Sequence, residues 1–258
     1  MTPAGTEFAP LAPGRVRVVY VHGFLDDAGV WDDVIARLPA PAPPVDAIDL
    51  AGMGSRADDS GPYGLARGAE DVAALVDQAE GPVVLVGQSM GAQVAELAAA
   101  LRPDSVAGLV LVAPVPLGGT GLPEEAVAPF KALGGDEPAQ RAVRQQLTAS
   151  LTGPALDRLI ARGLPCSPRA VAAFVDAWNT GDRRGDAPTA FAGPVVIVSG
   201  EADGFCTAEM IEGAIVPRFP GAEHVVVAGT GHWPHAEQPE AVAAAISALL
   251  TRVAAGGS

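Results

Sequence analysis

Short apolar runs alternate along this chain with longer segments of helical periodicity. The runs lack polar alternation, which is typical of strands buried on both faces of a parallel sheet. Helices between such strands imply right-handed crossovers, so the fold class is α/β, with a doubly wound and mostly parallel sheet. Strands are predicted at 16–21, 45–50, 83–86, 106–112, 195–198 and 224–227. Core helices are predicted at 30–38, 65–80, 90–101 and 240–253.

This alternation stops between the fourth and fifth predicted strands. Residues 117–188 contain helical patterns and no convincing strand, so they predict a helical cap inserted after the strand at 106–112. Such a cap would cover the carboxyl edge of the sheet, where open α/β sheets bind ligands. The predicted domains are a core formed by 1–116 and 189–258 and the cap at 117–188. The cap helices are predicted at 124–133, 139–150, 154–161 and 168–178.

Composition narrows the possible partners. In 258 residues, 49% are hydrophobic and 18% charged, which excludes a disordered chain. A net charge of −14 repels phosphates and anionic lipid, so we expect a small-molecule substrate and neither nucleic acid nor membrane as partner. Two cysteines, Cys166 and Cys206, are too few for a disulfide framework or a structural zinc site. Without a recognisable signal peptide or an uninterrupted apolar run of spanning length, the expected location is cytoplasmic. Oligomeric state cannot be read from the sequence.

The segment Gly87-Gln88-Ser89-Met90-Gly91 joins a predicted strand to a predicted helix. G-x-S-x-G in this context is typical of a nucleophile elbow, in which a tight turn projects the serine above the sheet. The helix that follows directs its N-terminal N–H groups towards any negative charge formed there. Ser89 is therefore the candidate nucleophile, although an ordinary glycine-containing turn would share this pattern.

A second backbone donor is expected from the loop after the first strand, which reads HGF at 22–24. The predicted oxyanion hole consists of the backbone N–H groups of Phe24 and Met90. The side chain of His22 is interpreted as a buried imidazole that braces this loop. Asp26 and Asp27 could form a metal pair, but capping of the following helix is the favoured interpretation.

The candidate general base is His232, in a glycine-rich loop after the last strand. His224 opens a strand and is interpreted as structural, whereas His235 could face substrate or cap a helix. The third member should be a carboxylate that holds the imidazole in one tautomer. Asp203 follows the fifth predicted strand and is the favoured candidate, with Glu201 as its local rival.

Five segments together carry a resemblance to a known family. They are HGF at 22–24, DLAGMGSR at 49–56, GQSMG at 87–91, GEAD at 200–203 and GHWPHAEQPEAV at 231–242. In this order they resemble the α/β-hydrolase superfamily, in its capped serine esterase and lactonase-like branch. The resemblance implies the α/β-hydrolase fold, with the triad in the order Ser, Asp, His. Two departures are a shortened or missing N-terminal hairpin and Ala51-Gly52-Met53-Gly54, where relatives often have Pro and His.

The predicted function is hydrolysis of a neutral, moderately apolar carboxylic ester or lactone through an acyl-enzyme on Ser89. No metal or organic cofactor is needed for this chemistry. Related enzymes that displace halide or open epoxides use an aspartate at the elbow, so Ser89 argues against both. A lyase, a carbon–carbon bond hydrolase, a cofactor-free oxygenase or a non-catalytic ligand receptor could share the scaffold. The predicted substrate pocket consists of Leu25, Phe130, Leu133, Phe174, Trp178, Phe205 and Trp233.

Overall fold

A computed structural model of the protein describes residues 16–256. Its six strands form one parallel sheet in the order β2-β1-β3-β4-β5-β6. The predicted α/β class is confirmed, and each strand end lies within two residues of its expected position. The strands are β1 (Arg17–Val21), β2 (Val45–Ile48), β3 (Val83–Gln88), β4 (Val106–Val112), β5 (Val195–Gly200) and β6 (Glu223–Val227).

The strand order reverses between β1 and β3. From β1 the chain runs outward to β2 and then returns to the other side of β1 to form β3. The loops after β1 and β3 therefore leave the carboxyl edge side by side. Such a switch point is where open α/β sheets bind their ligands.

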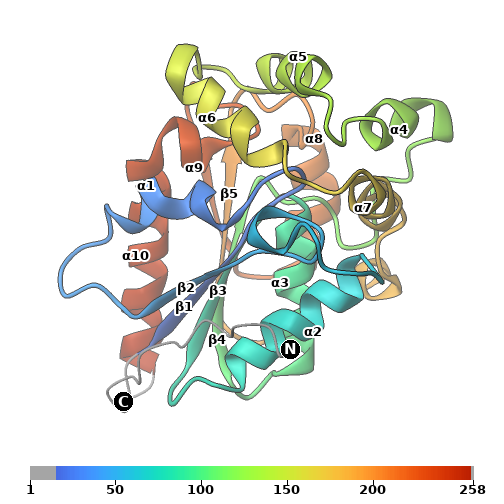
Figure 1. The fold of residues 1–258 in the computed structure, drawn as a ribbon. Coiled ribbons are helices and arrows are strands. Elements are labelled where there is room, and N and C mark those ends of the chain that lie inside the picture. The colour runs from blue at the N-terminus through green and yellow to red at the C-terminus, as the bar shows by residue number, and fades with distance from the viewer. Residues whose placement is uncertain (1–15, 257–258) are drawn as a thin grey trace.

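Helices cover both faces of the sheet (Figure 1). On one face α10 (Pro239–Gly256) packs on β4 and β5, beside α1 (Asp32–Ile35). On the other face α2 (Leu65–Val76) packs on α3 (Met90–Leu101), which lies against β3. Along β3, Val84 and Val86 belong to the core under α10, whereas Val83 and Leu85 belong to the core under α2 and α3. Burial on both faces explains why the central strands β3, β4 and β5 read as apolar runs.

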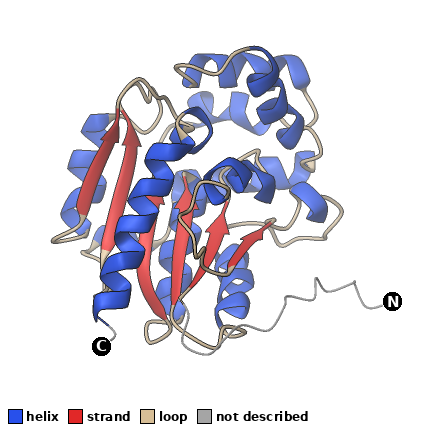
Figure 2. Ribbon diagram, turned by 90° about the vertical axis from the view of Figure 1, so that its left-hand side faces the viewer, coloured by secondary structure: helices blue, strands red, loops and turns tan. Residues whose placement is uncertain are grey.

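The segment between β4 and β5 consists of helices joined by loops, as predicted, and Figure 2 shows it above the carboxyl ends of the strands. The pairs α4–α7 and α5–α6 pack together. These helices are α4 (Glu124–Lys131), α5 (Glu137–Leu147), α6 (Gly153–Gly163) and α7 (Pro168–Thr180). That residues 117–188 form a cap domain separate from the core stays a prediction.

Shorter helical segments complete the described chain. The 3₁₀ segments are Ala28–Trp31, Gly54–Arg56, Arg183–Asp186 and Val216–Arg218, the π-helical segment is Ile211–Ile215, and the short α-helices are α8 (Ala208–Met210) and α9 (Pro234–Glu237). Between residues 16 and 256 no helix is both long and apolar enough to cross a membrane. The expectation about an N-terminal hairpin concerns residues 1–15, which lie outside the described part.

Candidate active site

Ser89 occupies a strained turn between β3 and α3. Its backbone has φ 53° and ψ −119°, a left-handed conformation that non-glycine residues adopt at an energetic cost. A Cβ atom on Gly87 would collide with the backbone of Gly91, and one on Gly91 would collide with the carbonyl of His22. Glycine is therefore required on both sides of the serine, and the turn packs directly against the loop after β1.

The structure brings Ser89, His232 and Asp203 together from three loops at the carboxyl edge of the sheet. His232 Nε2 lies 3.0 Å from Ser89 Oγ, and His232 Nδ1 lies 2.9 Å from Asp203 Oδ2. All three side chains are buried. An ionised carboxylate only accepts hydrogen bonds, so Nδ1 carries the proton and Nε2 is free to accept the Ser89 hydroxyl. This geometry can transfer a proton from the serine to the imidazole.

Asp203 is held as a carboxylate by its surroundings. Its Oδ1 accepts hydrogen bonds from the backbone N–H groups of Phe205 at 2.8 Å and Cys206 at 2.9 Å. Burial raises the pKa of Asp203, but the electrostatic attraction of the His232 ring and the hydrogen bonds from His232, Phe205 and Cys206 together outweigh burial and hold that pKa below its ordinary value. The rival Glu201 is exposed and accepts a hydrogen bond from Gly229 instead.

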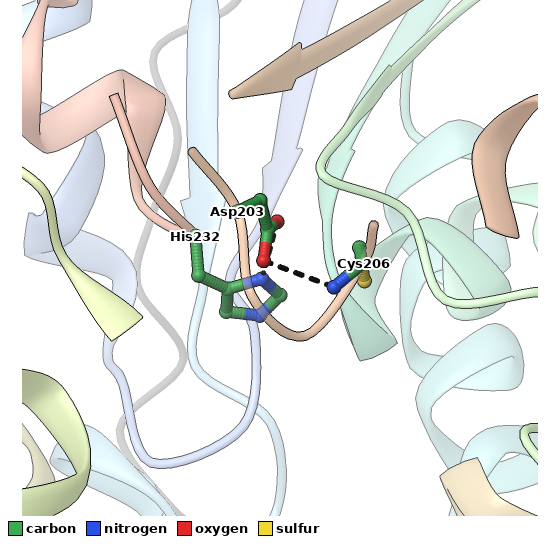
Figure 3. Close-up of side chains that lie close together, drawn as sticks. All are labelled: Asp203, Cys206 and His232. Atoms are coloured by element: carbon green, nitrogen blue, oxygen red, sulfur yellow. Dashed lines mark hydrogen bonds and ion pairs between the residues drawn. The ribbon is translucent and has the colours of Figure 1, made fainter. Parts of the chain in front are cut away.

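Figure 3 shows Asp203, Cys206 and His232 as one compact group. Their potential ligand atoms lie within 4.8 Å of one another. Both carboxylate oxygens are engaged with protons, and burial raises the pKa of the Cys206 thiol well above its ordinary value. The trio therefore does not fit a metal, and Cys206 contributes packing and a backbone donor.

Several contacts that hold the loop of His232 could not be anticipated from the sequence. Gln88 Nε2 donates to the carbonyl of His232 at 3.1 Å, and the His232 N–H donates to the carbonyl of Leu147 at 2.8 Å. Glu237 accepts from the N–H groups of Gly231 and Ala149, both at 2.8 Å. The elbow and the end of α5 thus hold the backbone of His232, at its carbonyl and at its N–H group.

The loop after β1 lies against the elbow, as the oxyanion-hole prediction requires. A Cβ atom on Gly23 would collide with the side chain of Gln88, so the two loops touch. Phe24 lines the same cavity as Ser89, and Met90 opens α3, where backbone N–H groups have no partner within the helix. His22 accepts from the N–H of Leu50 at 3.0 Å and donates to the carbonyl of Gly23 at 2.7 Å, which braces the loop.

Asp26 does not cap a helix, so the interpretation of its role was wrong. It is fully buried and accepts hydrogen bonds from Arg144 Nη1 at 3.1 Å and Trp233 Nε1 at 2.9 Å. Arg144 also donates to the carbonyl of Leu25. Only Asp27 caps the following helix, through the N–H of Gly29. Asp26 and Arg144 together connect α5 to the loop after β1 and, through Trp233, to the loop that carries His232.

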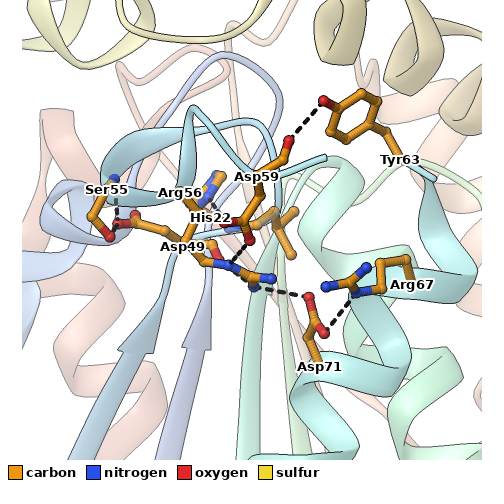
Figure 4. Close-up of polar contacts among 9 residues, drawn as sticks. His22, Asp49, Ser55, Arg56, Asp59, Tyr63, Arg67 and Asp71 are labelled. Atoms are coloured by element: carbon orange, nitrogen blue, oxygen red, sulfur yellow. Dashed lines mark hydrogen bonds and ion pairs between the residues drawn. The ribbon is translucent and has the colours of Figure 1, made fainter. Parts of the chain in front are cut away.

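Polar contacts hold the segment 49–56, which follows β2, in a compact loop (Figure 4). Asp49 accepts from the N–H of Ala28 at 2.7 Å and from the hydroxyl of Ser55 at 2.6 Å. Arg56 pairs with Asp59 and Asp71. These contacts fix the chain after β2 beside the loop that carries Phe24.

An apolar cavity lies beside Ser89 and His232. Six of the seven predicted pocket residues line it: Leu25, Phe130, Leu133, Trp178, Phe205 and Trp233. Phe174 does not, because it lies one helical turn before Trp178 and faces the core near Tyr63. Sequence reasoning missed four residues of α5 whose i, i+3, i+4, i+7 spacing marks one face: Gln140, Val143, Arg144 and Leu147.

His235 neither faces the cavity nor caps a helix. It is fully buried, its ring centroid lies 4.6 Å from that of Trp31, and neither ring nitrogen has a hydrogen-bond partner among the described residues. Burial lowers the pKa of His235 to about 3. The imidazole therefore belongs to the core as a neutral aromatic ring.

This histidine is expected to make the fold acid-sensitive. In the unfolded chain it takes up a proton at about pH 6.5, so between that pH and about pH 3 the unfolded state binds more protons. The free energy of unfolding should therefore fall by about 2 kcal/mol between pH 7 and pH 5 through this group alone. Urea unfolding at both pH values should show this loss in the native protein and not in His235→Phe, which keeps the ring stacking. An equal loss in both proteins would contradict the prediction.

A serine elbow at the carboxyl edge of a parallel sheet, hydrogen-bonded to a histidine that is itself hydrogen-bonded to a carboxylate, defines a hydrolase of the α/β class. The sequence profile of the alpha/beta hydrolase family matches residues 18–245. The chain belongs to this family, and the esterases among its relatives place it in the ester-hydrolase class.

Three comparisons illustrate this similarity. A pimeloyl-[acyl-carrier protein] methyl ester esterase of Neisseria meningitidis is 33% identical over 246 residues, covering 90% of this chain and 92% of the relative. Lipase LipV of Mycobacterium tuberculosis is 41% identical over 102 residues, covering 39% of this chain and 38% of the lipase. The structure of a thermophilic esterase from Thermogutta terrifontis, malate bound, superimposes with a TM-score of 0.80 at 26% identity, covering 93% of this chain and 91% of that chain.

Proposed function

We propose that the protein hydrolyses a neutral, moderately apolar carboxylic ester through an acyl-enzyme on Ser89. The observation that carries the proposal is the pair of hydrogen bonds from His232, 3.0 Å to Ser89 and 2.9 Å to Asp203. A hydroxyl, an imidazole and a carboxylate in this order are the parts that acyl transfer requires.

The reaction has two proton-coupled halves. His232 Nε2 takes the Ser89 proton as Oγ attacks the ester carbonyl, and Asp203 stabilises the imidazolium cation. The oxyanion accepts hydrogen bonds from the N–H groups of Phe24 and Met90, each contributing about 3 kcal/mol. When the carbon–oxygen bond breaks, His232 protonates the leaving alcohol. Water then repeats the sequence, with His232 taking its proton, and frees the acid and Ser89.

The cavity supports an uncharged substrate. Its lining is mainly apolar, and the cation of Arg144 is already compensated by Asp26 at 3.1 Å. The net charge of −14 further disfavours anionic substrates. A lactone would react by the same steps, with the leaving alcohol still tethered to the acyl group. Esterase activity in the Neisseria relative supports the ester as the first class to test.

A fluorophosphonate probe tests the proposal directly. We expect one covalent adduct, located on Ser89 by peptide mass spectrometry, together with turnover of p-nitrophenyl acetate that the probe abolishes. A labelled Ser89 without turnover of any ester or lactone would instead favour a lyase or a ligand receptor. An unlabelled Ser89 would overturn the assignment of the nucleophile.

A further inference from the structure

Four aromatic rings from four separate segments form one wall of the cavity beside Ser89. The ring of Trp178, on α7, lies 6.4 Å from Phe24, 5.9 Å from Phe130 and 5.5 Å from Phe205, measured between centroids. The contacts of Trp178 are edge-on, the arrangement that aromatic pairs prefer. Phe130 and Phe205 also touch each other, with centroids 5.8 Å apart, so the wall is continuous.

The cavity that this wall leaves is small, with a volume of about 40 Å³. A cavity of about 150 Å³ in another protein holds benzene, which corresponds to about 25 Å³ for each carbon atom. By that ratio, the free volume admits one or two carbon atoms. A longer chain would have to displace the rings.

The ring wall is anchored to the nucleophile helix. Gln93, a buried residue of α3, donates to the carbonyl of Pro116 at 2.7 Å and to that of Trp178 at 3.3 Å. The next residue, Asn179, exchanges two hydrogen bonds with the backbone of Leu122, at 2.8 and 2.9 Å. Moving Trp178 outward would break such bonds and leave buried polar groups without partners, which is unfavourable.

The opposite side of the cavity is fixed as well. Gln140 on α5 donates to the carbonyls of Leu133 at 2.9 Å and Gly163 at 3.1 Å. One turn later, Arg144 forms its buried ion pair with Asp26. Both flanks of the cavity are thus held by buried hydrogen bonds, which makes its size a property of the fold.

We propose that the enzyme is selective for esters with a short acyl group of two or three carbon atoms, namely the carbonyl carbon bonded to Ser89 Oγ and the one or two carbons that the cavity admits, and that Trp178 sets this limit. The inference rests on the proposed function. The alcohol must leave for solvent before water enters, whereas the acyl group stays on Ser89, so the cavity beside Ser89 receives the acyl group. The alcohol portion lies towards solvent and is less restricted.

Three p-nitrophenyl esters with one leaving group test this limit: the acetate, the butyrate and the octanoate. In the native protein, kcat/KM for the octanoate should be at least about 100-fold lower than for the acetate, since even one extra methylene in a fitted hydrophobic pocket discriminates by factors of about 10–200. Trp178→Ala should raise the octanoate-to-acetate ratio about tenfold. The ratio is independent of the fraction of folded enzyme, so a partly unstable variant remains informative.

Phe130→Ala provides a second opening of the wall at a half-buried position, which should fold even if Trp178→Ala does not. Phe174→Leu is the matched control, because Phe174 lies on the same helix as Trp178 and is buried away from the cavity. It should leave the ratio unchanged.

Two results would overturn the inference. They are an octanoate rate within threefold of the acetate rate in the native protein, and a ratio that neither Trp178→Ala nor Phe130→Ala raises. Both leave ester hydrolysis itself intact. Failure to turn over any of the three esters would overturn the proposed function, and the selectivity with it.

Discussion

Ser89→Ala is expected to lower kcat for p-nitrophenyl acetate by about 10⁶-fold, the loss found when the nucleophile of a serine protease triad is removed. The substitution deletes only Oγ, so the imidazole keeps its bond to Asp203 and the cavity keeps its walls. Alanine does not relieve the strained turn at φ 53°, so the fold should change little. Steady-state rates, with Tm measured alongside, give the comparison.

Ser199→Ala is the control for this result. Ser199 is also buried and its hydroxyl also contacts an imidazole, His224 Nε2, at 2.8 Å. That pair lies between β5 and β6 and does not line the cavity. Its loss should change kcat less than about threefold, as expected for a substitution that only affects stability. A Ser89→Ala enzyme that retains more than one per cent of native turnover would exclude Ser89 as the nucleophile.

Much of the sheet was predictable because burial on both faces leaves a direct signature in the central strands β1, β3, β4 and β5. The helix boundaries were less predictable from the sequence than the strands. The predicted helix at 30–38 is a 3₁₀ segment at Ala28–Trp31 followed by the short α1. Of the predicted apolar side, Val34 and Leu38 are nevertheless buried and Ile35 is half-buried. Periodicity identifies the buried face but does not distinguish i→i+3 from i→i+4 hydrogen bonding over so short a segment.

The convergence of Ser89, Asp203 and His232 was also predictable, because parallel strands deliver their following loops to one edge. Contacts between side chains distant in sequence were not. Asp26 and Arg144 are separated by 118 residues, and neither carries a local signal of its partner. Phe174 was wrongly assigned to the pocket for a related reason. The helices between β4 and β5 bury residues against both the core and the cavity, so burial alone does not identify the residues that line the cavity.

Asp203→Asn is expected to lower kcat about 10⁴-fold, as the corresponding substitution does in a serine protease triad. In the native protein Oδ1 accepts two backbone N–H groups, from Phe205 and Cys206. The asparagine amide must keep its oxygen at that position and turn its NH₂ towards His232 Nδ1. Nδ1 would then accept a hydrogen bond, and the ring proton would move to Nε2. An Nε2–H cannot take the proton of Ser89.

The matched control is Glu201→Gln, which removes a carboxylate two residues away that contacts Gly229 at 2.9 Å and not His232. It should change kcat less than about threefold. Because the side chain of asparagine has almost the shape of aspartate, Asp203→Asn should leave KM for the acetate ester within about twofold of the native value while kcat falls. If both substitutions reduced kcat equally, or if Asp203→Asn raised KM and left kcat unchanged, the carboxylate would not be orienting the imidazole for catalysis.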